Sequence, residues 1–427
     1  MVIIRIIPIF VFVIVIYYSK FVFCSQIYDY ETEKFIEKIN NEILSVNNYN
    51  KKIHFRIIDD ETPNAFINHN NELFISSGLI VNAPDYVAFL AVLAHEIGHL
   101  EKYHIAKKKD SIENLKSINA LGSITIIAGS LISNNPEMIN ALPVNQVGIN
   151  NFYINFSKDQ EREADLYAIE TLNKLNLSSN SVKQLLNILE KEALSKGFNE
   201  DMQKFSTHPI FRERYTIIDE KKNEGEKKFN TKLNDEFNFI KAKFLGYSRN
   251  EKKIKLSKHP EKYYKAIKNS KSGNLFLSLK LLNELIMQYP QNIYLIETKA
   301  DILISYGYKN EAIKFYEKVL NFYPDNKYTQ LRIFNNKDLE ELTYNQKNDL
   351  FNKNINLLFH FQNNNKIISK FLKLANYLNK KNWVEFFNLI KNKNKTKNLN
   401  YDNKLKNIKN NTNDNNLIKL INIMHKK

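Results

Sequence analysis

Along the first part of the chain, the apolar residues change from helical spacing to short β-rich stretches and then to a continuous run. Residues 26–48 repeat isoleucine and phenylalanine at intervals of three and four, which predicts an amphipathic helix. Residues 54–58, 64–68 and 73–77 are rich in β-branched and aromatic residues and predict strands, with turn residues at 69–71. A small β-sheet is therefore expected just before a long apolar segment.

That apolar segment, residues 87–98, runs into the motif HEIGH at residues 95–99. Helix residues four apart share one face, so His95 and His99 can present ring nitrogens to one Zn²⁺, with Glu96 beside the ion's remaining position. The pattern predicts metal-assisted hydrolysis, in which Glu96 accepts a proton from the attacking water. The alternative is a pair of core histidines bonded to backbone carbonyls, which the specificity of the motif disfavours.

A later acidic segment can complete this site. Residues 157–160, SKDQ, have the form of a capping box and start a helix that carries Glu161 and Asp165 on one face. A catalytic zinc ion with two histidine ligands takes a further protein ligand, for which we choose Glu161, while Asp165 can accept a hydrogen bond from an imidazole. Seen alone, such a cluster is more often a solvated acidic face.

The N-terminus resembles a targeting segment. In residues 1–24, Arg5 precedes a short apolar core, which predicts a secretory signal peptide cleaved near Cys24; an uncleaved membrane anchor is the alternative. Because Cys24 is the single cysteine, no intrachain disulfide can form. The apolar residues 118–132 are too few for a membrane span and predict a buried or membrane-apposed helix, and the Asn-rich residues 133–156 predict a loop near the site.

The second half of the chain contains an internal repeat within residues 261–324. Its period of 34 residues is that of tetratricopeptide repeats (TPR), although a plain helical bundle is an alternative. Two units cannot bury their own faces, so we expect degenerate helix pairs to extend a TPR-like domain over residues 261–390. The matched pairs are Ala266 and Ala300, Gly273 and Gly307, Leu279 and Ile313, Leu282 and Tyr316, Tyr289 and Tyr323, and Pro290 and Pro324.

The charge of the chain is strongly positive, at +16 for 427 residues. Lysine and asparagine are dense in residues 391–427, which predict a disordered tail that can end in a short helix at its apolar residues 417–424. Residues 226–260 predict a linker between two domains. No nucleic-acid recognition motif accompanies the charge, so we expect no nucleic-acid partner. An anionic membrane surface is a candidate partner for the basic tail.

Four motifs together resemble the zinc metallopeptidases that include HtpX, the CAAX prenyl proteases and the BepA-type enzymes. They are HEIGH at 95–99, FSKDQEREAD at 156–165, STHP at 206–209 with Arg214 beyond it, and Asn-Ala-Phe at 64–66. The resemblance covers roughly residues 26–220. This chain departs from the family in the turn after the Asn-Ala-Phe strand, where His69 and Asn70 replace glycines that are frequent in related proteins.

The resemblance implies a role for each site residue. His95, His99 and Glu161 would be the zinc ligands and Glu96 the general base. His208 would lie near the metal, where it either caps the ion in a resting enzyme or stabilises the transition state. Taken from the sequence alone, a histidine before proline is more often a turn residue. The strand residues Asn64, Ala65 and Phe66 would bind substrate, because an extended peptide can add to the edge of a sheet.

The sequence thus predicts a mainly α protein. A zincin-like metallopeptidase domain with a small β-sheet, residues 26–225, would precede an α-helical TPR solenoid. The predicted function is that of a periplasmic zinc-dependent endopeptidase that acts on unfolded or misassembled proteins. The resemblance suggests quality control or assembly of outer-membrane proteins, with the TPR domain binding substrate or the assembly machinery. The alternatives are a TPR scaffold or chaperone with a latent metal site, and a membrane-anchored HtpX-like protease.

Overall fold

The computed structural model describes the chain from residue 26 to residue 425 with gaps. Several features expected from the sequence lie outside the described residues: the segment 1–24, His69 in the predicted turn, the apolar segment 118–132, the loop 133–156, Ser157 of the predicted capping box and His208. Within the part that the structure describes, no helix combines the length and apolar character needed to cross a membrane. The described ranges are 26–49, 51–68, 70–102, 104, 158–195, 212–221, 228–249, 254–361, 364–392 and 398–425.

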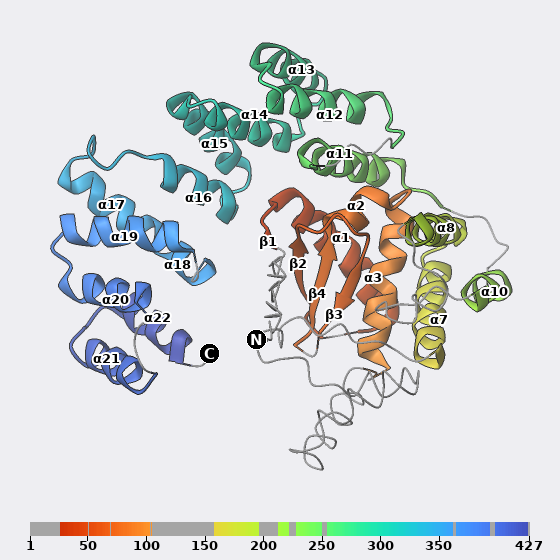
Figure 1. Cartoon of the computed structure of the whole chain (residues 1–427), viewed down its shortest axis with the longest axis horizontal. Coiled ribbons are helices and arrows are strands. Elements are labelled where there is room, and N and C mark those ends of the chain that lie inside the picture. Colours follow the sequence, from red (N-terminus) through yellow and green to blue (C-terminus); the bar gives the residue numbers. More distant parts are fainter. Residues whose placement is uncertain are drawn as a thin grey trace, which may run out of the picture.

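A four-stranded sheet with the order β1-β2-β4-β3 lies at the centre of the N-terminal domain (Figure 1). β1 (Gln26–Ile27) is antiparallel to β2 (His54–Ile58), and β2 is parallel to β4 (Glu72–Ser76). β3 (Ala65–Ile67) is antiparallel to β4 and is an edge strand of the described sheet. The three strands expected from the sequence are therefore confirmed, as is the mainly helical fold with a small sheet.

One face of the sheet packs against two helices. α1 (Tyr30–Asn47) confirms the amphipathic helix expected here, and the Asp29 side chain caps it by accepting a hydrogen bond from its first turn. Its apolar residues, among them Phe35 and Ile39, are buried in a core shared with the sheet and with α3 (Tyr86–Glu101), the helix of the HEIGH motif. The histidine-bearing helix is thus held in the centre of this domain.

A short helix that the sequence pattern does not predict connects the sheet to α3. α2 (Ser77–Asn82) begins at Ser76, whose hydroxyl accepts a hydrogen bond from the helix's first turn. Gly78 is required there, because a Cβ at this position would lie 2.3 Å from the carbonyl oxygen of Glu61. α3 then begins at Asp85, whose carboxylate caps its N-terminus.

α7 (Lys158–Lys174) packs along α3, and the two backbones approach each other at Gly98. A Cβ on Gly98 would lie 3.1 Å from the Cβ of Tyr167 and 3.2 Å from the Cα of Ala164. Because glycine has no side chain, α7 can lie close enough to bring its first turn beside the motif histidines. Among the described residues of this domain, two further helices follow α7, namely α8 (Asn180–Ser195) and α10 (Arg212–Lys221).

Residues 226–260 contain a buried helix, which corrects the expectation of a linker. α11 (Thr231–Tyr247) places Phe237 and Ile240 in the core of the N-terminal domain. On another side of the same helix, Phe239 belongs to the core of the following repeat helices. Apolar residues on two sides let α11 join the two cores, so this segment connects the domains as a shared structural element.

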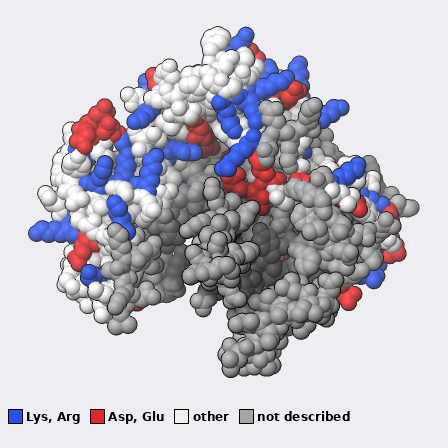
Figure 2. All heavy atoms as spheres, in the orientation of Figure 1, with Lys and Arg blue, Asp and Glu red and all other residues white. Residues whose placement is uncertain are grey.

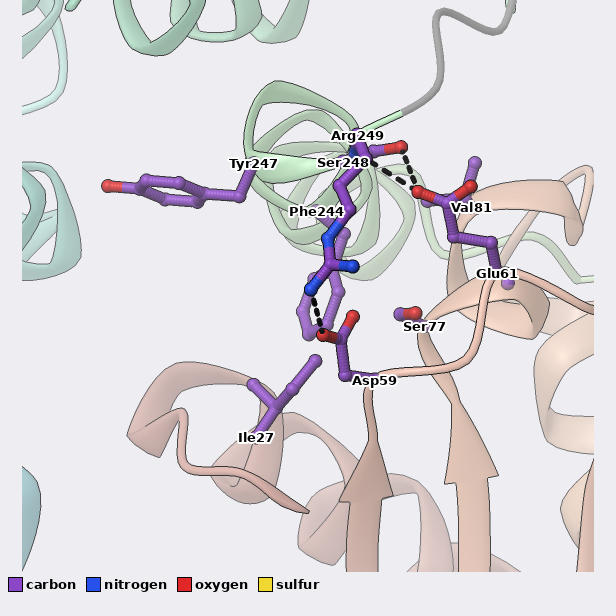
Figure 3. A pocket seen from close by; sticks show the side chains of 10 residues that line it. Ile27, Asp59, Glu61, Ser77, Val81, Phe244, Tyr247, Ser248 and Arg249 are labelled. Carbon is purple, nitrogen blue, oxygen red and sulfur yellow. Dashed lines mark hydrogen bonds and ion pairs between the residues drawn. The ribbon is translucent and has the colours of Figure 1, made fainter. Parts of the chain in front are cut away.

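The end of α11 is fastened to the sheet beside a pocket (Figure 3). The Ser248 hydroxyl and the Arg249 backbone N–H both donate hydrogen bonds to Oε1 of Glu61, at 2.9 Å and 3.0 Å. The Arg249 guanidinium also lies 3.8 Å from the Asp59 carboxylate. Since Asp59 and Glu61 follow β2, these contacts fix α11 to the loop at the end of that strand.

Four helices in two successive pairs follow α11. They are α12 (Lys258–Lys271), α13 (Leu275–Gln288), α14 (Ile293–Ser305) and α15 (Lys309–Phe322). The turn inside each pair contains a glycine with positive φ, Gly273 at 88° and Gly307 at 86°, a conformation that favours glycine over other residues. The helix pairs therefore repeat at the spacing that the sequence indicates, while their assignment as TPR units stays a prediction.

The remaining helices continue an arc around the N-terminal domain (Figure 1). They are α16 (Lys327–Asn336), α17 (Tyr344–Asn354), α18 (Asn356–His360), α19 (Asn365–Tyr377), α20 (Lys381–Lys391), α21 (Asn398–Asn410) and α22 (Asn415–His425). The expected disordered tail at 391–427 is wrong for its described part, residues 398–425, except that the short helix expected at its end is confirmed by α22. Leu405, Leu417 and Ile421 there are buried in one core with Trp383, which explains why these helices form.

Positive charge is spread over the arc and is not confined to the C-terminal segment. Figure 2 shows Lys and Arg side chains over the repeat helices on the face in view. Most of these helices expose lysines while their apolar residues face inward, as expected for amphipathic helices. The exposed lysines of α12 to α15 include Lys258, Lys265, Lys271, Lys280, Lys314 and Lys318.

The arc contacts the N-terminal domain at the first turn of α1. Tyr30 donates a hydrogen bond to Asp325 at 2.7 Å, and Tyr328 donates one to Glu33. Tyr28, just before α1, packs on Tyr328 with 5.3 Å between ring centroids. The bonded residues are 295 positions apart along the chain, so the contacts hold the repeat helices in one position relative to the sheet.

A buried ion cluster supports the same junction. The Lys243 ammonium on α11 lies 2.6 Å from the Asp29 carboxylate and 2.5 Å from that of Glu31, and all three groups are largely buried. Burial by itself would lower the pKa of Lys243, but the two carboxylates outweigh it and raise the pKa well above its ordinary value. Lys243 therefore stays charged and ties α11 to the start of α1.

Glu33 should make the stability of this protein depend on pH. Burial raises the pKa of Glu33 from 4.5 to about 7, so the folded protein retains a proton that the unfolded chain releases. The contribution of Glu33 to stability should therefore fall as the pH rises from 4.5 to about 7. Glu33→Gln removes this titration, so the thermal midpoint of the variant should rise relative to wild type across that window, as measured by circular dichroism.

Glu37→Gln is a suitable control for this measurement. Glu37 lies on the same helix, and its side chain is 52% exposed, so the substitution removes the same charge from a solvated site. Midpoint profiles that stay parallel for wild type and Glu33→Gln over this pH range would contradict the prediction.

Candidate metal centre

The two motif histidines and Glu161 converge on one point between α3 and α7. Nε2 of His95 lies 3.2 Å from Nε2 of His99. The Glu161 carboxylate lies 3.4 Å from Nε2 of His95 and 3.5 Å from Nε2 of His99. Among the described residues, these three form the group whose donor atoms are close enough to share a metal ion. The structure thus brings together the three ligands predicted from the sequence.

The geometry of this group fits a zinc ion. Zinc binds nitrogen and oxygen at about 2.0–2.1 Å, so two ligands of a tetrahedral ion are about 3.3 Å apart. The 3.2 Å between the two imidazole nitrogens agrees with that edge length, and the two oxygens of Glu161 lie at similar distances, Oε2 3.4 Å from Nε2 of His95 and Oε1 3.5 Å from Nε2 of His99. Two imidazoles and a carboxylate, with a fourth position left for solvent, are also a donor set that catalytic zinc uses.

Local folding explains why the donors meet. His95 and His99 are one turn apart on α3, so their rings lie on the same side of the helix. Glu161 is in the first turn of α7, which the absence of a side chain at Gly98 allows to approach α3. Both histidines and Glu161 are at most 5% exposed. Burial on packed helices limits their movement before any ion binds.

The orientation of His95 is set by a carboxylate and a guanidinium. Nδ1 of His95 lies 2.9 Å from Oδ1 of Asp165. An ionised carboxylate oxygen can accept a hydrogen bond but cannot donate one. A proton on Nδ1 of His95 would face this carboxylate, which would leave the lone pair of Nε2 directed at the metal position. Arg214 donates two hydrogen bonds to Asp165, from Nε at 2.8 Å and from NH2 at 2.6 Å. The structure thus places Asp165 where the sequence predicts an acceptor for an imidazole.

The electrostatics of the centre favour added positive charge. Burial lowers the pKa of His95, but Asp165 and Glu161 outweigh it and raise that pKa above its ordinary value. Burial by itself would raise the pKa of Asp165, but Arg214 and His95 outweigh burial and lower that pKa below its ordinary value. Asp165 therefore stays ionised. A site where carboxylates attract a proton to an imidazole is also a site where they stabilise a divalent cation.

Glu96 lies in the same buried environment. Glu96 directly follows His95 on the ligand-bearing helix and is 1% exposed. Burial would lower the pKa of Arg214, but Asp165, Glu161 and Glu96 together raise it above its ordinary value. The charge of Glu96 therefore acts on the Arg214 guanidinium, as that of Glu161 does, which places Glu96 close to the centre.

Two further residues at the centre are not singled out by the sequence motifs. His104 is 1% exposed and lies beside His99, with Nδ1 of each ring 3.0 Å apart. Nε2 of His104 lies 2.9 Å from Oε2 of Glu163 on α7. The spacing could have indicated them, since His104 follows the motif by five residues and Glu163 follows Glu161 by two.

The predicted substrate strand lies next to the metal helix, since β3 packs against α3. Ala65 is buried toward α3, whereas Phe66 points to the opposite side and stacks on Phe74 with 4.8 Å between ring centroids. Asn64 precedes the strand, and its carbonyl accepts a hydrogen bond from the Ser76 backbone. His208 is the one predicted site residue outside the described part of the chain.

Comparison with known proteins assigns this domain. A family model, "Peptidase family M48", matches residues 31–222. These residues belong to peptidase family M48. The match begins in α1 and ends directly after α10, so the M48 domain contains β2, β3 and β4 of the sheet, both ligand-bearing helices and Arg214, whereas β1 lies before it. α11 lies beyond the match, although it completes the core of the M48 domain.

Individual relatives extend the similarity beyond the M48 domain. The chain is 24% identical over 326 residues to a beta-barrel assembly-enhancing protease of Yersinia pestis, covering 72% of this chain and 66% of that protein. It is 25% identical over 296 residues to a putative beta-barrel assembly-enhancing protease of Vibrio cholerae, covering 63% and 58%. It is 24% identical over 190 residues to the mitochondrial metalloendopeptidase OMA1 of Schizosaccharomyces pombe, covering 44% and 52%. The matched part is thus less than two thirds of each relative.

Asp165→Asn should weaken zinc binding to the M48 domain. The substitution keeps the shape of the side chain but removes the charge that fixes the proton of His95 on Nδ1 and pairs with Arg214. Loss of such an outer partner typically lowers metal affinity about 10- to 100-fold. Titration of the metal-free protein with zinc against a chromogenic chelator measures this change.

The control for this experiment is Glu170→Gln on the same helix. Glu170 is exposed, so its neutralisation removes one negative charge from α7 without altering a ligand. If Asp165→Asn binds zinc as tightly as Glu170→Gln, Asp165 does not orient the ligand.

Proposed function

We propose that this chain is a zinc-dependent endopeptidase of the periplasm that acts in the quality control or assembly of outer-membrane β-barrel proteins. The observation that carries the peptidase part is the meeting of His95, His99 and Glu161, whose donor atoms lie close enough together to hold one zinc ion. Membership of the domain in peptidase family M48 supports it. The names of the bacterial relatives support the part concerned with β-barrel assembly.

The residues of this site have separable roles in peptide hydrolysis. Zinc, when bound, polarises the scissile carbonyl and lowers the pKa of water to about 7. His95, His99 and Glu161 would hold the ion. The Glu96 carboxylate would accept a proton from the attacking water and deliver it to the leaving nitrogen. The buried position of Glu96 excludes bulk water that would compete for that proton.

The outer edge of β3 is the place where we expect an extended peptide to bind. On its inner side, Asn64 accepts a hydrogen bond from Ser76, and Asn68 donates one to Glu72. Because hydrogen bonding alternates along antiparallel strands, the residues between them, Ala65 and Ile67, direct their N–H and C=O groups to the outer side. A substrate strand on that side would lie next to α3, within the domain that holds the metal site.

The repeat helices would bind the substrate or a partner protein. They form an arc that is fixed to the M48 domain through α11 and the first turn of α1 (Figure 1). A protein held on such a surface stays near the active site, which raises its effective concentration there. We propose unfolded or misassembled β-barrel proteins as the substrates and the outer-membrane assembly machinery as the partner. The resemblance of residues 1–24 to a secretory signal supports the periplasmic location.

Glu96→Gln tests the enzymatic part of the proposal. The variant should retain zinc, because Glu96 is not a ligand, but its cleavage of an unfolded protein such as casein should fall about 100-fold or more, since proton transfer typically contributes about 10²- to 10⁴-fold. Zinc content and cleavage rate are measured on the same preparation, with and without a chelator.

Glu101→Gln, at the end of the same helix, is the matched control and should retain activity. A fully active Glu96→Gln protein would exclude Glu96 as the base. Full rescue of a deletion strain by inactive Glu96→Gln would instead favour the alternative function, a scaffold in which the metal site is latent.

Ala65→Pro tests the binding of substrate at β3. Proline removes the N–H that faces the outer edge and breaks no bond to β4, so the sheet should persist while peptide affinity falls. The expected result is a KM raised several-fold, with zinc content and thermal midpoint close to wild type. Phe66→Pro, which removes a bond to β4, is the comparison and should lower the thermal midpoint. An unchanged KM in a folded Ala65→Pro protein would exclude this edge as the substrate site.

A further inference from the structure

His104 is a buried imidazole in contact with the metal centre that none of the predicted roles includes. It lies just beyond the end of α3 and is 1% exposed. Its Nδ1 is 3.0 Å from Nδ1 of His99, and its Nε2 is 2.9 Å from Oε2 of Glu163. The His104 ring therefore bridges a ligand histidine and a carboxylate, with one ring nitrogen in contact with each.

The carboxylate decides the direction of both hydrogen bonds. An ionised Glu163 can only accept, so the proton of neutral His104 lies on Nε2 and points to Glu163. Nδ1 of His104 then has a lone pair and accepts the Nδ1 proton of His99. A neutral imidazole that carries its proton on Nδ1 has its free lone pair on Nε2. In His99, that Nε2 is the atom at the metal position.

The two ligand histidines thus have equivalent supports built from different residues. Nδ1 of His95 meets the Asp165 carboxylate directly. Nδ1 of His99 meets a second imidazole, which extends the path to the Glu163 carboxylate. A histidine ligand is commonly fixed in tautomer and ring orientation by an acceptor at its other nitrogen. The structure supplies such an acceptor for each ring.

We propose that His104 is a positioning residue of the metal centre, which fixes the tautomer and ring orientation of His99 and is itself anchored by Glu163. This inference rests on the proposed zinc site and deepens it. Without His104, the Nδ1 proton of His99 would lose its buried acceptor, and the proton could move to Nε2, where it blocks the metal position. His104 would therefore contribute to zinc affinity without touching the ion.

The first test compares two replacements of His104 in the full-length metal-free protein. His104→Leu removes the acceptor and replaces the imidazole by an apolar side chain of similar size. His104→Asn places an amide oxygen on Cγ, where His104 has Nδ1, and so keeps an acceptor for His99. Zinc dissociation constants are measured by competition with a chromogenic chelator, and the thermal midpoint of each metal-free protein is recorded by circular dichroism.

We expect His104→Leu to bind zinc about 10- to 100-fold more weakly than wild type. His104→Asn should recover at least half of that loss on a logarithmic scale. His360→Leu, which removes an exposed imidazole from α18 in the repeat region, is the control and should bind zinc as wild type does. A purely structural role for His104 would lower the thermal midpoint of the metal-free variants without the recovery of zinc affinity in His104→Asn.

A double-mutant cycle tests the anchoring by Glu163. If Glu163 acts through His104, Glu163→Leu should weaken zinc binding in the wild-type background but add no further loss in His104→Leu. Additive losses would overturn the path from Glu163 to His99. Equal zinc affinity of His104→Leu and wild type would overturn the role of His104 itself. A wild-type protein that binds no zinc would instead overturn the proposed site, so the two failures are distinguishable.

Discussion

The close packing of α3 against α7 is the constraint on which the metal centre depends. Two of the residues that could hold a metal ion lie on α3 and one on α7, so the distance between these helices decides whether three donors can reach one ion. Gly98 sets that distance, because a Cβ there would press on Tyr167 and on the backbone of Ala164. The glycine inside the HEIGH motif therefore has a packing role that is separate from the chemistry of its neighbours.

Burial strengthens the electrostatic interactions of the metal centre, but it also requires that each buried charge has a partner. Charged groups removed from water must be paired, and in this site the pairing also orients the ligands. Asp165 aligns His95 and is held by Arg214, while the path through His104 to Glu163 reaches His99 from the other side. The same contacts thus satisfy buried polar atoms and direct two lone pairs at one point.

The repeat helices are joined to the M48 domain by residues that serve both parts. α11 contributes Phe237 to one core and Phe239 to the other, and the first turn of α1 is bonded to Tyr328 of the arc. The buried Lys243 cluster lies at this junction. The junction thus combines apolar contacts, ion pairs and hydrogen bonds. Together they give the arc a defined position relative to the sheet, whose edge strand β3 is the proposed substrate site.

The sequence by itself determined the local features. The HEIGH spacing predicts two imidazoles on one helix face, and the 34-residue period predicts the helix pairs that contain Gly273 and Gly307. Tertiary structure decided which distant groups meet. It brought His104 and Glu163 to His99, made α11 part of two cores, and folded residues 398–425 onto Trp383. Spacing along a chain reveals periodicity within one element, whereas contacts between elements depend on packing that no single segment encodes.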